Sequence, residues 1–400
     1  MFDPADPKFL ADPYPVFARL RERAPVHWHE GLGLYVAVSH AACDRLLRDR
    51  SLGRLWRDRE PVEAFPAFNM LHRTSILENE PPTHTRLRRL VAGAFGRGHV
   101  ERMRPWIEAL AGRLVDDLAS RVERDGSADL LETVAQPLPV EVIAELLRVP
   151  ADARPSLRPW SNAIVKMYEY DLAPERRAEA EDAARAFVAM LREVVAERRR
   201  RPVPSDLVSD LVAAADGGDR LTEDEVVGTC VLLLMAGHEA TVNVLGNGML
   251  ALLSRPQEWR RLLDDPSSVV PAAEEMIRFD TSLQLFERTA TRDVDLLGTR
   301  IPAGTKVAAL LGAANRDPAV FADPDRFDVG RTPNPHLGFG AGIHFCLGAP
   351  LARIEVQAVL SALRTRLPAI GPAGPARRRP EFVIRGLSEL AVTADPVSAG

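Results

Sequence analysis

A segment of about thirty residues that begins at Thr222 constrains the fold more than any other part of this chain. Its first half, "VVGTCVLLLMAG", is apolar on every side, so a helix formed by it must be buried. Thr222 and Glu225 have the spacing of a capping box, and Arg255-Pro256 marks the end of the helix. At ~1.5 Å per residue such a helix is about 45 Å long, enough to run through the centre of a domain.

Polar groups interrupt this buried segment. "AGHEAT" follows the apolar run directly, and Asn243 and Asn247 come later in the same helix. A buried glutamate such as Glu239 needs a partner, a water-filled cavity or a chemical role. The sequence therefore predicts a central helix that lines a site.

Composition favours a soluble protein of the cytoplasm. The net charge of −5 gives no footprint for nucleic acid. The apolar run from Val226 to Gly237 is too short to cross a bilayer, and the N-terminus lacks the charged and apolar regions of a signal peptide. The three cysteines form no C-x-x-C pair, which argues against a disulfide framework or a zinc cluster. Without repeats or a low-complexity linker, we expect residues 1–400 to form one domain.

Helical periodicity dominates the chain. "DPYPVFARLRERAP" predicts a short helix, and "VHWHEGLGLYVAVS" predicts a hairpin that turns at Gly31 to Gly33. Alternating residues predict short strands within 285–308 and 382–393. The other helices are expected at residues 84–95, 100–124, 137–148, 153–168, 175–201, 222–254, 256–264, 268–279 and 346–367.

One cysteine stands in an unusual context, "HLGFGAGIHFCLGAP". A lone free cysteine is most often a small buried hydrophobic residue. Here Gly340, Gly342 and Gly348 surround Cys346, and glycine is used where the backbone takes a positive φ or approaches another body closely. A helical pattern begins at or just after Cys346, and a helix N-terminus stabilises a thiolate. The residues therefore favour a ligand over a packed side chain.

These residues carry a family resemblance. "FGAGIHFCLG" resembles the F-G-x-G-x-H-x-C-x-G signature of the cytochrome P450 haem-thiolate monooxygenases, and the similarity covers nearly the whole chain. The resemblance implies a mainly α, orthogonal helical fold with a long central helix and small β-sheets. It implies haem b as the cofactor and Cys346 as the proximal ligand of its iron. Phe339, Gly340 and Gly348 would then belong to the haem-binding loop.

Further motifs fit the same family. Glu275-x-x-Arg278 alone is a common helix salt bridge, but in the family this pair joins a later arginine, which Arg331 matches, in a buried structural network. "PPTHTRLRRL" alone reads as a solvated basic face. By the resemblance, four cationic or N–H donors would bind the haem propionates: His84, Arg88, Arg288 and His344.

The segment "AGHEAT" resembles the family's oxygen-binding segment, with one departure. Small Ala236 and Gly237 would leave room for dioxygen and allow a local break in the helix, and Glu239 matches an acid that relays protons. Ala240 stands where most members carry a threonine. A step of about 100° turns Thr241 away from that point. We expect a substrate hydroxyl or an ordered water to complete the relay.

Pocket positions also follow from the resemblance, although aromatic and methionine side chains are as often plain core. Asn69 and Gln284 are the most interesting candidates, because a polar group in an apolar cavity fixes the orientation of a ligand. "NAIVKMYEYDLAPERR" is expected to form a mobile lid or an ordinary surface loop. The candidate lining residues are Phe68, Asn69, Met70 and Leu71 in the loop before His84, Leu233, Ser282, Gln284, Leu285 and Phe286, and Leu387.

The resemblance implies a monomeric monooxygenase that inserts one oxygen atom of dioxygen into a small organic substrate, such as a secondary metabolite. The chain has no flavin or nicotinamide fingerprint, so electrons should come from a separate ferredoxin or flavodoxin with an NAD(P)H-dependent reductase. Three alternatives stay open: a peroxide-driven enzyme, which Ala240 allows, a haem-binding sensor without turnover, and a helical protein with a structural cysteine. Retention of Glu239 favours the monooxygenase.

Overall fold

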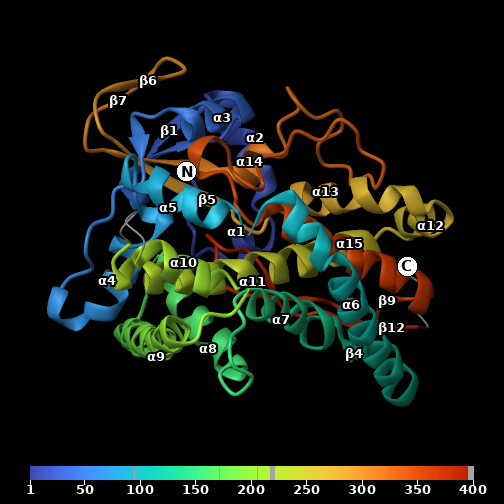
Figure 1. Ribbon diagram of the computed structural model, residues 1–400. Coiled ribbons are helices and arrows are strands. Elements are labelled where there is room, and N and C mark those ends of the chain that lie inside the picture. The colour runs from blue at the N-terminus through green and yellow to red at the C-terminus, as the bar shows by residue number, and fades with distance from the viewer. Residues whose placement is uncertain (94, 171, 205, 217–220, 395–400) are drawn as a thin grey trace. The chain divides into compact units, whose positions relative to one another are not determined.

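The computed structural model describes residues 1–93, 95–170, 172–204, 206–216 and 221–394 (Figure 1). The predicted mainly helical fold with small sheets is confirmed. The chain divides into two compact units. The first comprises Met1–Gly53, Met103–Leu138 and Ala240–Gly400, and the second comprises Arg54–Arg102 and Pro139–Glu239. The expectation of a single domain stays a prediction.

A five-stranded sheet organises the first unit, in the order β1-β2-β8-β5-β3. The predicted hairpin is present: β1 and β2 pair in antiparallel fashion, and Gly33 takes the positive φ of 63° that the turn requires. β8 is parallel to β2 and antiparallel to β5. The strands span Val26–His29 (β1), Leu34–Ala37 (β2), Leu52–Gly53 (β3), Leu285–Ala290 (β5) and Lys306–Leu310 (β8).

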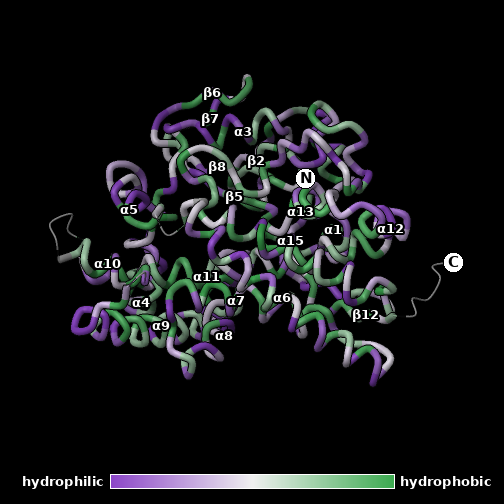
Figure 2. The backbone as a smooth tube through the Cα atoms, turned by 45° about the vertical axis from the view of Figure 1, so that its right-hand side comes forward, coloured by the Kyte–Doolittle hydropathy of each residue, from purple (hydrophilic) through white to green (hydrophobic). Residues whose placement is uncertain are grey.

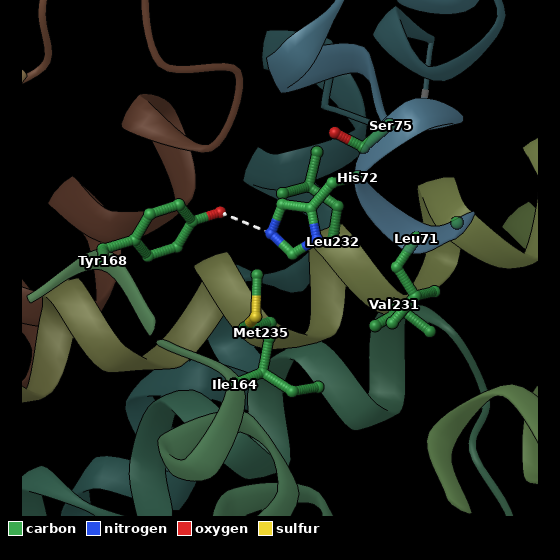
Figure 3. Close-up of a pocket in the computed structure, with 9 residues that line it drawn as sticks. Leu71, His72, Ser75, Ile164, Tyr168, Val231, Leu232 and Met235 are labelled. Atoms are coloured by element: carbon green, nitrogen blue, oxygen red, sulfur yellow. Dashed lines mark hydrogen bonds between the residues drawn. The ribbon is translucent and has the colours of Figure 1, made fainter. Parts of the chain in front are cut away.

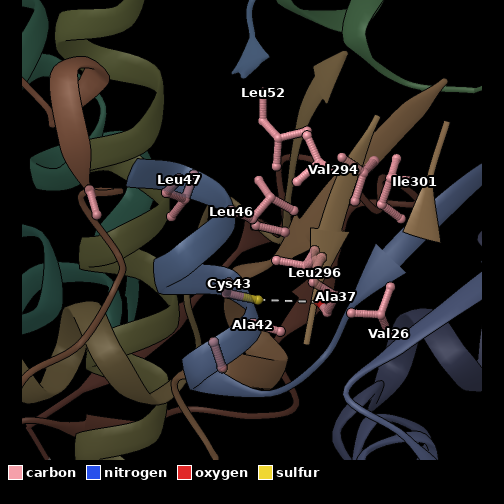
Figure 4. Packing of buried hydrophobic residues seen from close by; sticks show 14 of the residues in the cluster. Val26, Ala37, Ala42, Cys43, Leu46, Leu47, Leu52, Val294, Leu296 and Ile301 are labelled. Carbon is pink, nitrogen blue, oxygen red and sulfur yellow. Dashed lines mark hydrogen bonds between the residues drawn. The ribbon is translucent and has the colours of Figure 1, made fainter. Parts of the chain in front are cut away.

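A hydrophobic cluster packs this sheet against α3, His40–Arg48 (Figure 4). Leu46 and Val307 are fully buried in it. Cys43 lies in the same cluster, and its thiol donates a hydrogen bond of 3.2 Å to the carbonyl oxygen of Ala37. This part of the unit is therefore a buried hydrophobic core.

The other elements of the first unit are helices and two- or three-stranded sheets. The helices are α1 (Pro7–Ala11), α2 (Tyr14–Arg23), α12 (Pro256–Asp264), α13 (Val269–Phe279), α14 (Leu311–Ala314), α15 (Ala349–Arg366) and the π-helix η4 (Leu131–Ala135). The small sheets pair β4 (Ala128–Asp129) and β9 (Gly371–Pro372) with β12 (Ala391–Thr393), β6 (Val294–Leu296) with β7 (Thr299–Ile301), and β10 (Arg377–Arg378) with β11 (Leu387–Glu389).

The second unit is helical in its described part. α8 packs along α9, and α4 also contacts α9. The carboxylate of Glu181 on α9 accepts hydrogen bonds from the first free amides of α4, at Ala67 and Phe68, so α4 has a charged partner at its N-terminus. The helices are α4 (Pro66–Arg73), α5 (Thr83–Ala92), α7 (Pro137–Leu146), α8 (Arg154–Val165), α9 (Pro174–Arg200) and α10 (Leu207–Asp216), while α6 (Arg97–Asp125) begins here and continues into the first unit.

The long apolar helix is α11, Glu223–Leu253, close to its predicted bounds. The predicted capping box is present: the Thr222 amide donates to Glu225 at 2.9 Å, and the Glu225 amide donates to the Thr222 hydroxyl at 3.2 Å. By length and composition alone α11 could cross a membrane, but 72% of its most apolar window is buried inside the protein. Its tube is largely green in Figure 2, as expected of a core helix.

Local signals were weakest for short helices. The segment from Phe68 to Leu71 is not the expected loop but part of α4, because Pro66 occupies the first turn of this helix and Phe68, Leu71 and His72 share a buried face. The short helices α1, α3, α10 and α14 were not predicted. The predicted helix at 346–367 begins at Ala349, so Cys346 precedes it instead of starting it.

Candidate active site

Exposure separates Cys346 from the other two cysteines. Cys43 and Cys230 are fully buried, and burial raises the pKa of both thiols, that of Cys230 to about 12. Cys346 is partly exposed and forms no disulfide. Because thiolate character and access decide cysteine reactivity, Cys346 is the cysteine best placed to bind a ligand.

The loop that carries Cys346 is held by backbone geometry. The Cys346 amide donates to the carbonyl oxygen of Phe339 at 2.9 Å, which closes the loop on itself. Gly340 and Gly342 take φ values of 69° and 71°, which side chains disfavour. A Cβ atom on Gly342 would also overlap the carbonyl oxygen of Leu47. Glycine is therefore required at position 342 for two independent reasons.

The loop leads into α15. Gly348 is the N-cap residue, and a Cβ atom there would lie 4.0 Å from the Cys346 Sγ. The thiol is thus close to the first turn of an 18-residue helix, whose free amides and dipole favour a negative charge. This arrangement supports a thiolate at Cys346.

A charged pair braces the loop. Arg353 on α15 binds Glu274 on α13 at 2.6 and 2.9 Å, and its guanidinium lies 4.6 Å from the centre of the Phe339 ring. His336 also binds Glu274, at 3.1 Å. Burial alone would raise the pKa of Glu274, but the hydrogen bonds from His336 and Arg353 lower it to about 2. Phe339, which accepts the bond from Cys346, is therefore held from α13 and α15.

The predicted structural network lies together in the same unit. Glu275 and Arg278 are fully buried and bind each other at 2.7 Å, and Arg331 binds Glu275 at 3.1 Å. Asn334 donates a further bond to Glu275 at 3.2 Å. The remaining Arg278 donors bind backbone carbonyl oxygens, including that of Asn315 at 2.7 Å. Every charge in this network has partners, as burial demands.

The four candidate propionate ligands come from both units. In the second unit, α5 places His84 and Arg88 one helical turn apart, with His84 buried. In the first unit, β5 carries Arg288, which is 2% exposed and stacks on Phe286 at 4.4 Å. His344 ends a short 3-10 helix beside Cys346. Among these four candidates, each unit by itself contains one arginine and one histidine, and their role as propionate ligands stays a prediction.

The exposure of successive side chains changes abruptly within the "AGHEAT" segment of α11. Ala236 and Ala240, one helical turn apart, are exposed, whereas Glu239 and Thr241 are 7% and 5% exposed. Thr241 therefore lies off the face that carries Ala240, as its position in the helix predicts. α11 is a continuous α-helix here, so the local break allowed by Gly237 is not present. Gly237 has a packing role instead, because a Cβ atom there would lie 2.8 Å from Cγ1 of Ile143.

A small cavity in the second unit lies among α4, α8, η5 (Lys166–Tyr168) and α11 (Figure 3). Its volume is about 10 Å³, scarcely room for one water. Tyr168 and His72 point toward one another, and the Tyr168 hydroxyl lies 3.1 Å from His72 Nε2. This bond joins α4 to the segment predicted as a lid. The lining residues are Leu71, His72, Ser75, Ile164, Tyr168, Gly228, Val231, Leu232 and Met235.

Of the predicted pocket residues, Leu71 lines this cavity. Asn69 is fully buried, and its amide both accepts from and donates to the backbone of Arg59, at 2.8 and 3.1 Å. Gln284 is also fully buried, and its Nε2 donates to the Thr281 carbonyl oxygen at 2.6 Å. Both atoms of the Asn69 amide fasten the backbone, whereas Gln284 Oε1 has no hydrogen-bond partner among the described residues, so both pocket assignments stay predictions.

Most of the other candidate pocket residues are also buried. Phe68 stacks on His72 with ring centres 4.1 Å apart and is core, while Phe286 lies under the Arg288 guanidinium. Leu233, Ser282, Leu285 and Leu387 are buried, and Met70 is half-buried. The sequence did not indicate that His72, Tyr168 and Met235 line a cavity. The i, i+3 spacing of Leu232 and Met235 on an all-apolar helix places both on one face, and this could have pointed to Met235.

Comparisons with known proteins identify the family to which this chain is similar. The family model "Cytochrome P450" matches residues 156–366. The cytochrome P450 monooxygenase PikC of Streptomyces venezuelae is 40% identical over 96% of this chain and 91% of its own length. The 6-deoxyerythronolide B hydroxylase of Saccharopolyspora erythraea is 37% identical over 97% of each. The crystal structure of P450BioI with an acyl carrier protein that carries hexadec-9Z-enoic acid has a TM-score of 0.91 at 34% identity, covering 96% of this chain and 99% of that one.

Proposed function

The chain belongs to the cytochrome P450 family of haem-thiolate monooxygenases, and we propose that it oxidises an oxygenated secondary metabolite. A hydroxyl group of that substrate would assist proton delivery at Ala240. A relative named polyketide biosynthesis cytochrome P450 PksS, from Bacillus subtilis, is 34% identical over 98% of each chain and supports a substrate of the polyketide class. Electrons would come from a ferredoxin or flavodoxin and its NAD(P)H-dependent reductase.

The residues present fit a haem group. Cys346 is the partly exposed thiol in a loop that glycines shape, and it would hold the iron. His84, Arg88, Arg288 and His344 have the donor chemistry that two propionates require. The chain has no C-x-x-C-H motif for covalent attachment, which supports haem b. When bound, the haem supplies the activation of dioxygen.

One observation carries the proposal on proton delivery. Ala240 is exposed on α11, whereas the hydroxyl of Thr241 belongs to a side chain that is 5% exposed. The alanine at position 240 has no hydroxyl group, and the hydroxyl group of Thr241 is turned into the packed interior. Glu239, which is 7% exposed, directly precedes Ala240 in the same helix. A hydroxyl group on the substrate would complete the path beside Ala240.

The test compares a hydroxylated polyketide with its deoxy analogue in a ferredoxin-driven assay. The measured quantity is product formed per NAD(P)H consumed. We expect the native enzyme to couple well with the hydroxylated compound and poorly with the deoxy one, and Ala240→Thr to improve coupling of the deoxy compound. Thr241→Ala should leave coupling unchanged, because its hydroxyl lies off this face.

Equal coupling of both compounds by the native enzyme would contradict substrate assistance. Loss of coupling in Thr241→Ala would assign the role to Thr241 instead. Full turnover with hydrogen peroxide and none with a reductase system would replace the monooxygenase by the peroxide-driven alternative.

A further inference from the structure

A second cleft, of about 280 Å³, lies wholly within the first unit. It is formed by the last two turns of α11, the end of α13, residues 11–14, the segment that follows α14 and parts of the C-terminal segment. Its lining is strongly charged, unlike that of the small cavity beside His72. Four arginines line it: Arg255, Arg316, Arg378 and Arg385.

Asp280 neutralises part of this charge. Its carboxylate binds Arg385 at 2.7 Å and Arg378 at 2.8 Å, and it accepts a bond of 2.7 Å from the Tyr14 hydroxyl. Burial alone would raise the pKa of Asp280, but the two arginines hold it well below its usual range. One negative charge is thus shared by two guanidinium groups.

Arg316 has a weaker counterion. Its guanidinium lies 3.8 Å from the ring centres of both Tyr14 and Phe279, which fixes its plane. It binds Asp325 at 2.9 Å, but the Asp325 side chain is 75% exposed, so water screens much of this attraction.

Arg255 has no carboxylate within ion-pair distance among the residues that the structure describes. It donates one hydrogen bond of 2.7 Å, to the Ala251 carbonyl oxygen, and stacks over Phe279 at 4.8 Å. Burial, and then the like charge of Arg316, lower the pKa of Arg255, although a guanidinium stays protonated in proteins. Most of its five N–H donors remain available.

The charges of the cleft do not balance. The third carboxylate of the lining, Asp12, accepts a bond from the Tyr14 amide at 3.2 Å. Four guanidinium groups therefore face three carboxylates, and the surplus positive charge lies at Arg255 and Arg316, whose planes are fixed by stacking on one ring. Fixed guanidinium groups favour planar, bidentate contacts with carboxylate or phosphate oxygens.

We propose that this cleft binds a small anion through a phosphate or carboxylate head group, with Arg255 and Arg316 as its main ligands. The site is separate from the oxygenation chemistry and does not depend on it. The volume of the cleft admits a compact body behind the head group.

Calorimetric titration of the haem-loaded full chain tests the proposal, with inorganic phosphate in one arm and succinate in the other at constant ionic strength set by chloride. We expect saturable binding of at least one probe, and the arm that binds assigns the head group. Arg255→Gln should weaken binding at least about tenfold, the loss of a charged hydrogen bond. Arg300→Gln is the matched control, because Arg300 is 80% exposed and its loss changes the net charge equally.

A gain-of-affinity variant keeps the test independent of folding defects. Asp325→Asn removes an exposed carboxylate that competes for Arg316, so binding should tighten by about two- to fivefold. Absence of saturable binding by both probes would overturn the proposal. So would an equal loss of affinity in Arg255→Gln and Arg300→Gln, because that result would show attraction by net charge alone.

Discussion

Replacing Glu355 by glutamine removes an ionisable group from the buried face of α15 while keeping the size of the side chain. Glu355 is 1% exposed, and among the described residues its Oε2 has no hydrogen-bond partner. Burial raises the pKa of this carboxyl group well above its ordinary value. The native protein therefore keeps a proton that the unfolded chain releases.

The sign and size of the effect follow from this difference in bound protons. An unfolded glutamate loses its proton near pH ~4.3, and the native one only at the raised pKa. Between these two values the native state binds more protons, so the free energy of unfolding falls as the pH rises. The slope is ~1.4 kcal/mol per pH unit at its steepest. The contribution of Glu355 is complete below the unfolded pKa and is lost once the pH passes the folded one.

Urea unfolding of the haem-loaded protein at pH 5, 6 and 7 measures this slope. We expect Glu355→Gln to gain stability relative to the native protein as the pH rises. Glu132→Gln is the control, because that side chain is 70% exposed and should give a difference that stays flat with pH. A flat difference for Glu355→Gln as well would show that Glu355 has a charged or hydrogen-bonded partner and would contradict a raised pKa in the native protein.

Two further variants probe the frame of the cysteine loop. Glu275→Gln should destabilise the protein by about 3–5 kcal/mol, because it leaves Arg278 fully buried beside a neutral partner, and urea unfolding checks this value. Gly342→Ala should lose most of its haem, measured as haem bound per chain after purification, because the new methyl group has no space at a positive φ. Gly374→Ala, where a Cβ atom meets nothing within 4 Å, should keep its haem, and equal retention by both alanine variants would contradict the steric account.

The features that the sequence predicted best are those with local causes. The capping box at Thr222 and Glu225 and the proline after Arg255 fix the ends of α11 within a few residues. The motif around Cys346 predicted the glycine geometry of its loop. In contrast, α4 was missed because an eight-residue helix offers too few turns for its periodicity to stand out.

Long-range contacts account for the remaining differences. Arg353 meets Glu274 across 79 residues of sequence, so no spacing rule predicts the brace on Phe339. Asn69 and Gln284 looked like ligand contacts, because polar residues in apolar surroundings suggest a pocket. In the structure, backbone groups use both atoms of the Asn69 amide and the nitrogen of the Gln284 amide, while Gln284 Oε1 has no hydrogen-bond partner among the described residues. A sequence gives the chemistry of such a side chain but not the partner that uses it.

The proposed role of Cys346 as the thiolate ligand of the haem iron can be measured in the spectrum of the reduced, carbon-monoxide-treated protein. The native protein should show the red-shifted band of a thiolate-ligated haem, and Cys346→His, loaded with haem to the same extent, should show the band of an imidazole-ligated one. Cys43→Ala, which changes a buried core thiol, should keep the thiolate spectrum. A native spectrum without the red-shifted band at full haem loading, or an unchanged spectrum in Cys346→His, would contradict the assignment.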